Sequence, residues 1–295
     1  MRLMTISVLA LLGATACAGA KTPDFTQAPP PAELDVDAPQ PGGSVDQAAL
    51  AAAIKGAWRT DADKARDAFR HPVETLTFFG VRPSDTVVEI TPGGGWYTHV
   101  LAPYLAKQGR YVAAMGDPAA SERAAQNVAA FKSRFADEAI YGKVETSVFG
   151  RDGKAACAPG TADVVLTFRN VHNWMGGGFH DNAYKSFFDC LKPGGVLGVV
   201  EHRREESAGP QDPKGGDGYI KESYVIAAAE KAGFKLAGKS EVNANPKDTK
   251  DHPFGVWTLP PVRSSGNPPA ANFDRAKYDA IGESDRMTLK FVKPN

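Results

Sequence analysis

The chain has 295 residues, a length that suits one large domain or two small ones. Its 34 lysine and arginine residues balance 34 aspartate and glutamate residues. Because no basic or acidic excess is present, we expect no nucleic-acid partner and no coating of an anionic membrane. The apolar and charged fractions, 42% and 23%, are ordinary for a globular protein, so the function has to be inferred from local motifs.

The amino terminus has the features of an export signal. Arg2 supplies a positive charge, residues 6–12 form a short apolar run, and small residues follow. The run is too short for a membrane-spanning helix, which needs about 20 apolar residues. We therefore expect residues 1–17 to direct the protein out of the cytoplasm. Cys17 resembles the lipidated cysteine of bacterial lipoproteins, but the residues before it also suit ordinary cleavage, so a membrane-anchored lipoprotein and a periplasmic protein both stay open.

A linker is predicted before the folded domain. Residues 18–45 are rich in proline and glycine and carry too few apolar side chains to form a core. From residue 46 the pattern changes, because apolar residues recur at helical spacing between Leu50 and Phe69 until His71-Pro72 stops the run. The domain is predicted to span 46–295.

Strands and helices alternate through this domain. Nearly continuous apolar runs predict buried parallel strands, and helical periodicity predicts the segments between them. The expected strands are 86–90, 110–115, 143–149, 163–168, 196–201, 234–241 and 287–292. The expected helices after the first strand are 97–105, 120–135, 182–191 and 219–232. We therefore predict a Rossmann-like, doubly wound α/β fold with a seven-stranded sheet, mostly parallel with the last strand antiparallel, and an insertion at about 243–283.

A glycine loop joins the first strand to the helix after it. Pro92 and the three glycines that follow it come directly behind strand 86–90. Such a loop lets a ligand approach the backbone, and it presents free N–H groups to an anionic group. A dinucleotide site would want the pattern G-x-G-x-x-G, but Thr98 stands at the third glycine position. This difference disfavours a nicotinamide oxidoreductase without excluding it.

Three segments in the right order resemble the class I S-adenosylmethionine-dependent methyltransferases. Residues 88–95 resemble the first motif of that family, 191–195 the turn into its fifth strand, and 230–234 the junction before its sixth. The resemblance spans roughly 66–293 and is strongest to a group of predicted exported bacterial methyltransferases. It implies S-adenosyl-L-methionine as the cofactor and a small molecule or an envelope component as the methyl acceptor.

The resemblance assigns the glycine loop to the cofactor. It implies that Glu89 helps to hold the methionine end, and that the loop formed by Thr91, Gly93, Gly94 and Gly95 gives the cofactor access to the backbone. Thr91 replaces the usual first glycine of the family, and the next residue is a proline. We therefore expect the loop to avoid a positive φ at Thr91.

A second departure from the family concerns the ribose. Met115 stands where the family has the acid that bonds both ribose hydroxyls, and Asp117 follows two residues later. A slightly shifted loop would let Asp117 bind the cofactor in its place. The alternative, in which Asp117 only starts a turn or caps the next helix, stays open.

Asn170 and His172 follow the fourth strand, at the edge where open parallel sheets bind ligands. Imidazole titrates near neutrality, so His172 is a candidate to take a proton from an oxygen or nitrogen acceptor during methyl transfer. We assign Asn170 to the same site and to the cofactor. In the alternative interpretation, Asn170 and His172 bond the loop backbone while Trp174 packs over the adenine.

Weaker candidates flank the same edge. His202 ends the fifth strand, Ser284 to Arg286 precede the last strand, and Arg66 and Arg70 lie on the leading helix. A helix with such charges is more often a solvated face, so a structural and a binding role both stay open.

The two cysteines beyond Cys17 are expected to form a disulfide. Cys157 and Cys190 show no metal-ligand spacing, and we expect no metal. Each precedes one of two neighbouring parallel strands, so their Cα atoms can come within the roughly 4.4–6.8 Å that a disulfide requires. In an oxidising compartment such a pair is more often structural than catalytic.

Two classes of function stay open at this point. The first is the methyltransferase. The second is a non-catalytic exported binding or interaction module built on the same fold, since a fold does not fix a function. A protein of the second class would be expected to lose residues of the family's cofactor site, as the departures at Thr91 and Met115 indicate. The sequence carries no signal for the oligomeric state.

Overall fold

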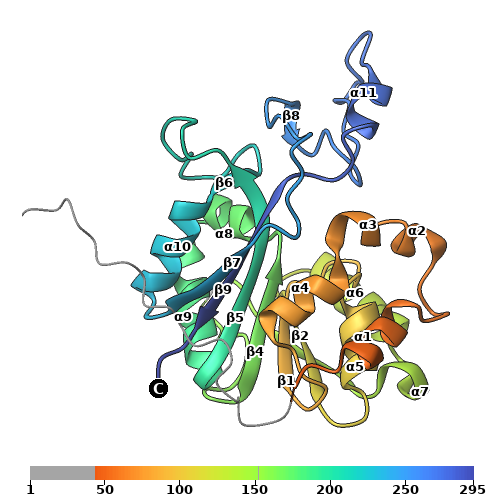
Figure 1. Ribbon diagram of the computed structural model, residues 1–295, viewed down its shortest axis with the longest axis vertical. Coiled ribbons are helices and arrows are strands. Elements are labelled where there is room, and N and C mark those ends of the chain that lie inside the picture. The colour runs from red at the N-terminus through yellow and green to blue at the C-terminus, as the bar shows by residue number, and fades with distance from the viewer. Residues whose placement is uncertain (1–43, 152) are drawn as a thin grey trace, which may run out of the picture. The chain divides into compact units, whose positions relative to one another are not determined.

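The apolar runs of the sequence form one central sheet (Figure 1). Along it the strands lie in the order β3-β2-β1-β4-β5-β9-β7, and the short β6 pairs with β5 beside this path. The strands are β1 (Thr86–Ile90), β2 (Arg110–Met115), β3 (Val144–Val148), β4 (Ala162–Phe168), β5 (Leu191–Arg204), β6 (Ile220–Lys221), β7 (Lys235–Ser240) and β9 (Arg286–Val292). Neighbours from β3 to β5 are parallel, and β9 is antiparallel to both β5 and β7. The predicted Rossmann-like fold is confirmed.

This computed structural model describes residues 44–151 and 153–295, which fall in one compact unit, Pro39–Asn295. The predicted export signal, Cys17 and nearly all of the predicted linker lie outside the described residues. Within the described ranges, no helix combines the length and the hydropathy that a bilayer crossing requires.

Alternation along the strands divides the core into two layers. Val87 of β1 packs with one hydrophobic cluster and Val88 with the other, because successive strand side chains point to opposite faces. The same alternation separates Val164 from Val165 in β4. Both faces of these strands are therefore buried, as a parallel sheet requires.

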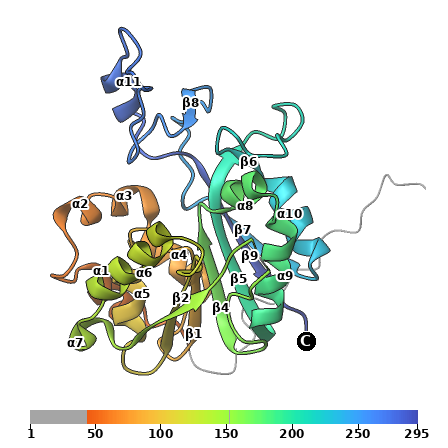
Figure 2. The same ribbon diagram turned by 180° about the vertical axis from the view of Figure 1, so that it is seen from behind.

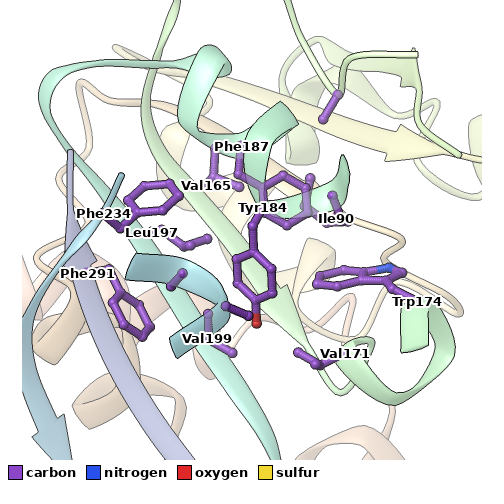
Figure 3. Packing of buried hydrophobic residues seen from close by; sticks show 14 of the residues in the cluster. Ile90, Val165, Val171, Trp174, Tyr184, Phe187, Leu197, Val199, Phe234 and Phe291 are labelled. Atoms are coloured by element: carbon purple, nitrogen blue, oxygen red, sulfur yellow. The ribbon is translucent and has the colours of Figure 1, made fainter. Parts of the chain in front are cut away.

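Helices cover each face of the sheet (Figures 1 and 2). One layer packs against α1 (Gln47–Ile54), α4 (Pro72–Phe79), α5 (Thr98–Leu105) and α6 (Glu122–Arg134), with the short α7 (Glu138–Tyr141). The other packs against α8 (Val171–Gly177), α9 (His180–Cys190) and α10 (Glu222–Lys231). Figure 3 shows this second layer, in which Tyr184 and Phe187 of α9 lie beside strand residues such as Val165 and Leu197.

The leading segment is not the single helix that its periodicity predicts. It divides into α1, α2 (Asp61–Lys64) and α3 (Asp67–Arg70), because the chain turns after α1 and Thr60 caps a new start with its side chain. His71 then takes a left-handed conformation with φ +38°, and Pro72 begins α4. The predicted stop at His71-Pro72 is confirmed.

β5 is longer at both ends than predicted. The predicted turn around Gly194 continues the strand instead, because Gly194 donates to the Lys293 carbonyl and Lys293 donates to the Gly195 carbonyl. At the other end, Arg203 and Arg204 pair with β6. β5 therefore carries residues beyond the edge of β4.

The insertion between β7 and β9 lies above that extended end of β5 (Figures 1 and 2). It contains β8 (Pro253–Val256) and α11 (Arg275–Asp279). Val256 donates its backbone N–H to the Asp217 carbonyl, so the insertion is joined to the loop between β5 and β6. It thus contributes a wall to the carboxyl edge of the sheet.

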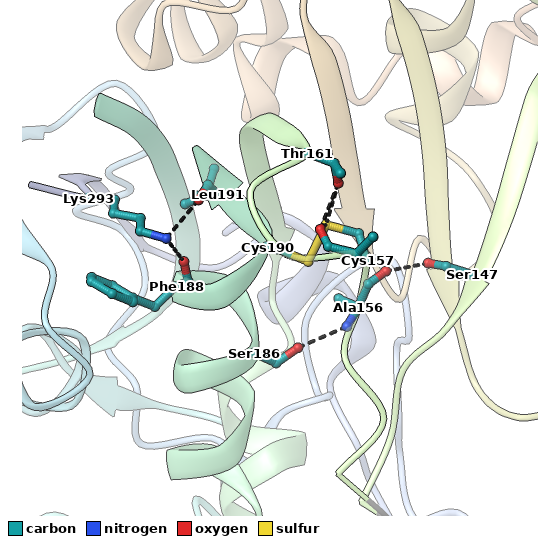
Figure 4. The surroundings of a disulfide bond; sticks show 10 residues. Ser147, Ala156, Cys157, Thr161, Ser186, Phe188, Cys190, Leu191 and Lys293 are labelled. Atoms are coloured by element: carbon teal, nitrogen blue, oxygen red, sulfur yellow. Dashed lines mark hydrogen bonds between the residues drawn. A yellow bond between two sulfur atoms is a disulfide. The ribbon is translucent and has the colours of Figure 1, made fainter. Parts of the chain in front are cut away.

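The predicted disulfide is present (Figure 4). Cys157 and Cys190 are bonded, with their Cα atoms 5.4 Å apart. The bond joins the loop before β4 to the end of α9, at the amino edge of the sheet. It therefore lies at the opposite edge from the predicted site.

Candidate functional site

Four segments meet at the carboxyl edge of the sheet. Parallel β1, β4 and β5 end there, and β9 begins there because it runs the opposite way. The segments are 91–95 after β1, 169–172 after β4, 201–202 in β5 and 283–286, which leads into β9. Chemistry-bearing residues far apart in the sequence are thus brought to one place, as open α/β sheets do at this edge.

The glycine loop turns through three left-handed residues. Thr91, Gly93 and Gly95 have φ values of +48°, +59° and +80°. The expectation that Thr91 avoids a positive φ is therefore wrong. Its N–H still bonds the Ala114 carbonyl of β2 at 2.8 Å, so the chain has to leave the sheet at Thr91 itself. A β-branched residue in this conformation is strained.

The loop is open on one side and packed on the other. A methyl group added to Gly93 would meet no atom within 4 Å, so the backbone there is accessible. At Gly95 the same methyl would lie 2.4 Å from the Phe135 ring, so this glycine is required by packing. Arg134 of α6 donates to the Gly94 carbonyl at 2.6 Å and holds the loop in place.

Glu89 lies beneath the loop. Its carboxylate is 2% exposed and accepts hydrogen bonds from the hydroxyls of Tyr111 at 2.5 Å and Thr98 at 3.2 Å. Burial raises the pKa of Glu89 to about 7, although these hydrogen bonds oppose the rise. The carboxyl group fixes α5 against β1 and β2. Its predicted contact with a cofactor stays a prediction.

Asp117 lies in a turn after β2. Its carboxylate accepts a hydrogen bond from the Ala119 N–H at 2.8 Å and pairs with Lys154. The hydrogen bond from Lys154 is the main cause that lowers the pKa of Asp117. Ser121, not Asp117, caps α6. The turn alternative therefore describes the observed geometry, and ribose binding by Asp117 stays a prediction. Met115 is buried in the core.

Asn170 links the end of β4 to the end of β1 at the carboxyl edge of the sheet. Its amide donates to the Ile90 carbonyl at 2.9 Å, so the end of β4 is tied to the start of the glycine loop. This part of the backbone-bonding alternative is confirmed. Trp174 does not face an adenine site, because it is buried against Phe149 and Phe187 in the core (Figure 3).

His172 is held by Glu201 and not by the loop backbone. Its Nδ1 lies 3.0 Å from Glu201 Oε1. The Glu201 carboxylate also accepts the backbone N–H groups of Val171 at 2.6 Å and His202 at 2.9 Å, and it is fully buried. A carboxylate fixed in this way holds the imidazole in one orientation, and Nε2 is left as the ring nitrogen that has no hydrogen-bond partner among residues 44–151 and 153–295.

His202 is the second histidine at this point. Its ring lies 5.5 Å from that of His172, and its Nδ1 contacts the Ser284 hydroxyl at 2.6 Å. Burial, followed by the nearby His172 and Arg169, lowers the pKa of His202 well below the ordinary value. His172, Glu201 and His202 bring one potential metal-ligand atom each within 4.8 Å. Glu201 already accepts three N–H groups, which favours an orienting role over metal binding.

Arginines surround one glutamate beside the histidines. Glu283 pairs with Arg66 at 2.6 Å, Arg286 at 2.9 Å and Arg70 at 3.1 Å. Burial opposes the ionisation of Glu283, but the arginines outweigh it and lower its pKa to about 2. The expectation of a solvated arginine face is wrong for Arg70, which is 2% exposed. The helix that carries it folds over the edge of the sheet.

A cavity of about 200 Å³ lies between the histidines and the insertion. Its polar wall consists of Arg169, His172, His202, Glu283 and Ser284, and its apolar wall includes Trp257 and Leu259. The sequence singled out His172, but it missed Arg169, Glu201, Glu283 and Trp257 as site residues. A polar residue at the end of an apolar strand was the available signal for Arg169 and Glu201. No such sequence signal pointed to Trp257, because it lies in the insertion.

Comparisons with known proteins concern the fold. No family model matches the sequence, and no curated protein is significantly similar to it. An S-adenosylmethionine-dependent methyltransferase from Aquifex aeolicus is 19% identical, with a TM-score of 0.46 over 61% of this chain and 87% of that one. A putative methyltransferase from Haloferax volcanii, in complex with the activator Trm112, is 17% identical, with a TM-score of 0.49 over 79% and 93%. A putative methyltransferase from Bacillus halodurans is 15% identical, with a TM-score of 0.46 over 75% and 98%. Likeness at this level carries no statement about the reaction.

Proposed function

We propose that the protein is an S-adenosylmethionine-dependent methyltransferase that acts on a small molecule or an envelope component. The hydrogen bond from Asn170 to the Ile90 carbonyl carries this proposal. Because of this hydrogen bond, the accessible glycine loop and the oriented His172 are neighbours at one edge of the sheet. A nucleoside-bearing ligand on the loop and a proton acceptor for the second substrate would thus be adjacent.

The loop suits the proposed cofactor at Gly93, where the backbone is open to close approach. S-adenosylmethionine, when bound, would supply an electrophilic methyl group. Gly93 and its neighbours would hold it through backbone contacts. The pair of Asp117 with Lys154 is exposed, so Asp117 can exchange that partner for a ribose hydroxyl.

His172 would act on the methyl acceptor. The oxygen or nitrogen of the acceptor would bond to the methyl carbon while the carbon–sulfur bond breaks and its electron pair leaves with the sulfur of S-adenosylhomocysteine. The proton of the acceptor would pass to Nε2 of His172, and Glu201 would stabilise the resulting imidazolium. General base catalysis of this kind contributes roughly 100- to 10,000-fold to a rate. Alignment of the two substrates would supply much of the remainder.

Calorimetric titration of the purified protein with S-adenosylmethionine and S-adenosylhomocysteine tests the proposal. We expect saturable binding that a Gly93→Leu substitution abolishes, because the new side chain would occupy the open face of the loop. Gly160→Leu is the matched control, since Gly160 also has a positive φ and open surroundings but lies in the loop before β4. No heat at about 1 mM ligand would reject the methyltransferase.

A second candidate function is a non-catalytic binding module. The observation that favours it is the missing ribose acid: Met115 is buried in its place, and the Asp117 carboxylate already has partners. Absence of cofactor binding together with retained binding of another small molecule would support this candidate.

We also propose that the protein is exported, on the basis of residues 1–17. Fractionation of cells that produce the full chain tests this. A lipoprotein would be found in the membrane fraction and would move to the soluble periplasmic fraction on Cys17→Ser substitution. A cytoplasmic location would contradict export and would leave the proposed chemistry unaffected.

A further inference from the structure

The guanidinium of Arg169 lacks a partner at the wall of the cavity. Among the described residues, its side chain makes no hydrogen bond or ion pair, although it lies in the field of Glu283 and Glu201. Burial, followed by the charge of Arg286, lowers the pKa of Arg169 to about 10. Arg169 also has a φ of +61°, a strained conformation for a residue other than glycine.

The surrounding charges do not neutralise Arg169. Glu283 is shared by Arg66, Arg70 and Arg286, so four cations face one anion in this cluster. Within the part of the chain that the structure describes, one terminal nitrogen of Arg66 and one of Arg70 are buried without a hydrogen-bond partner. Glu201 is engaged by His172 and two backbone N–H groups. Like charges held together away from water are costly unless an anion joins them.

The rest of the cavity favours an anion with an apolar body. Trp257 stands edge-on to His172, with ring centroids 6.0 Å apart. Val256, Leu259 and Pro260 continue this apolar wall. A planar guanidinium matches the two oxygens of a carboxylate or phosphate, while the opposite wall suits a ring or a short hydrocarbon chain.

We propose that this cavity binds a small organic oxyanion, a carboxylate or a phosphate monoester, through the guanidinium of Arg169. Resting on the proposed function, this ligand is the methyl acceptor. Its charged group lies on Arg169, its apolar part lies against Trp257, and its hydroxyl or amine faces His172. The neutral overall charge of the chain thus conceals a local site for anions.

Titration of the purified full chain with three probes tests this, in the absence of S-adenosylmethionine. The probes are benzoate, phenyl phosphate and benzamide, which is the uncharged analogue of benzoate. We expect at least one anion to bind more tightly than benzamide. Arg169→Met should weaken that anion roughly ten- to hundredfold and leave benzamide within about twofold, because only charged hydrogen bonds are lost. The preferred anion identifies whether the charged group that Arg169 binds is a carboxylate or a phosphate.

Three controls keep the test decisive. Arg110→Met removes an exposed arginine that pairs with Glu145 on β3, and it should leave all three affinities unchanged. Arg169→Met should unfold at the same temperature as the wild type or higher, because an unpaired charge is removed. Arg169→Lys keeps the charge without the planar fork and should give an intermediate affinity.

Three results would overturn the proposal. The first is that neither anion binds more tightly than benzamide. The second is that Arg169→Met leaves anion binding intact. The third is that S-adenosylhomocysteine competes with benzoate and loses affinity equally in Arg169→Met, which would assign the arginine to the cofactor. Because the anions are titrated alone, their binding can succeed where cofactor binding fails, so the two proposals fail separately.

Discussion

The two halves of the carboxyl edge differ in how they satisfy their polar groups. On the β1 side, Glu89 is bonded by two hydroxyls, and Arg134 is bonded to the Gly94 carbonyl. On the β4–β5–β9 side, Arg169 has no hydrogen-bond or ion-pair partner among the described residues, and three arginines share Glu283. The polar groups named in the first half have partners within the protein, whereas the second half keeps an excess of positive charge. Residual charge of this kind points to a ligand, so the second half defines what the protein selects.

The largest effect should come from removing the one anion of the arginine cluster. Glu283→Gln should cost about 3–5 kcal/mol of unfolding free energy, because a buried ion pair loses one partner and the arginines then repel each other. Urea denaturation at pH 7 measures this. Glu145→Gln, which removes the partner of the exposed Arg110, is the control and should cost no more than about 1 kcal/mol. Equal costs would show that the buried arginine cluster depends on Glu283 no more than an exposed ion pair depends on its carboxylate.

The stability of the protein at acid pH tests the role of Glu283 in a second way. The pKa of Glu283 is about 2 in the folded chain, below its ordinary value of 4.5. Its stabilising contribution is therefore present above pH 4.5 and is lost as the pH falls towards 2. In Glu283→Gln this part of the acid dependence should disappear.

The disulfide should affect stability without affecting the site. Cys157→Ser with Cys190→Ser should cost roughly 3–4 kcal/mol, since the bond closes a loop across a sequence separation of 33. Thermal unfolding measures the loss. Because the bond lies at the amino edge, benzoate affinity in the folded double variant should equal that of the wild type. A changed affinity would show that the two edges of the sheet are coupled.

Glu89 should make the β1 half sensitive to pH in the neutral range. Its pKa is raised by burial to about 7, above the ordinary 4.5, so the folded chain favours the protonated carboxyl. Stability from this group is fully present below pH 4.5 and is lost as the pH rises through 7, by roughly 1–3 kcal/mol. Urea denaturation between pH 5 and pH 8 should show this decline in the wild type. Glu89→Gln should flatten it, and an unchanged decline would assign the effect to another group.

The smallest effect should come from the strained threonine. Thr91→Gly should stabilise the chain by up to about 1 kcal/mol, because glycine accepts a left-handed conformation without strain. The same change at Thr86, an extended position in β1, should destabilise by about as much. Thermal unfolding of the two variants should therefore give shifts of opposite sign. Shifts of the same sign would show that the loop stores no strain at Thr91.

The same contrast explains what the sequence could predict. The glycine loop is contiguous, and β1 before it and β2 after α5 are runs of apolar residues, so both strands are predicted with their observed bounds. The arginine cluster joins residue 66 to residue 286, and no local pattern announces contacts over such a separation. The sequence predicts the wrong conformation for Thr91, because the residue's intrinsic preference does not include the Ala114 hydrogen bond that fixes the chain there.

At the extended end of β5, the residues proposed to take part in the reaction and the residues proposed to contact the apolar part of the substrate belong to different parts of the fold. His172 and Glu201 belong to the sheet edge, whereas Trp257 and Leu259 belong to an insertion that adds no strand to the sheet. Residues of the insertion can therefore be exchanged without disturbing strand pairing. Relatives with the same histidine–carboxylate pair and a different insertion would accept other molecules. Grafting that segment between such chains would be a direct way to transfer substrate preference.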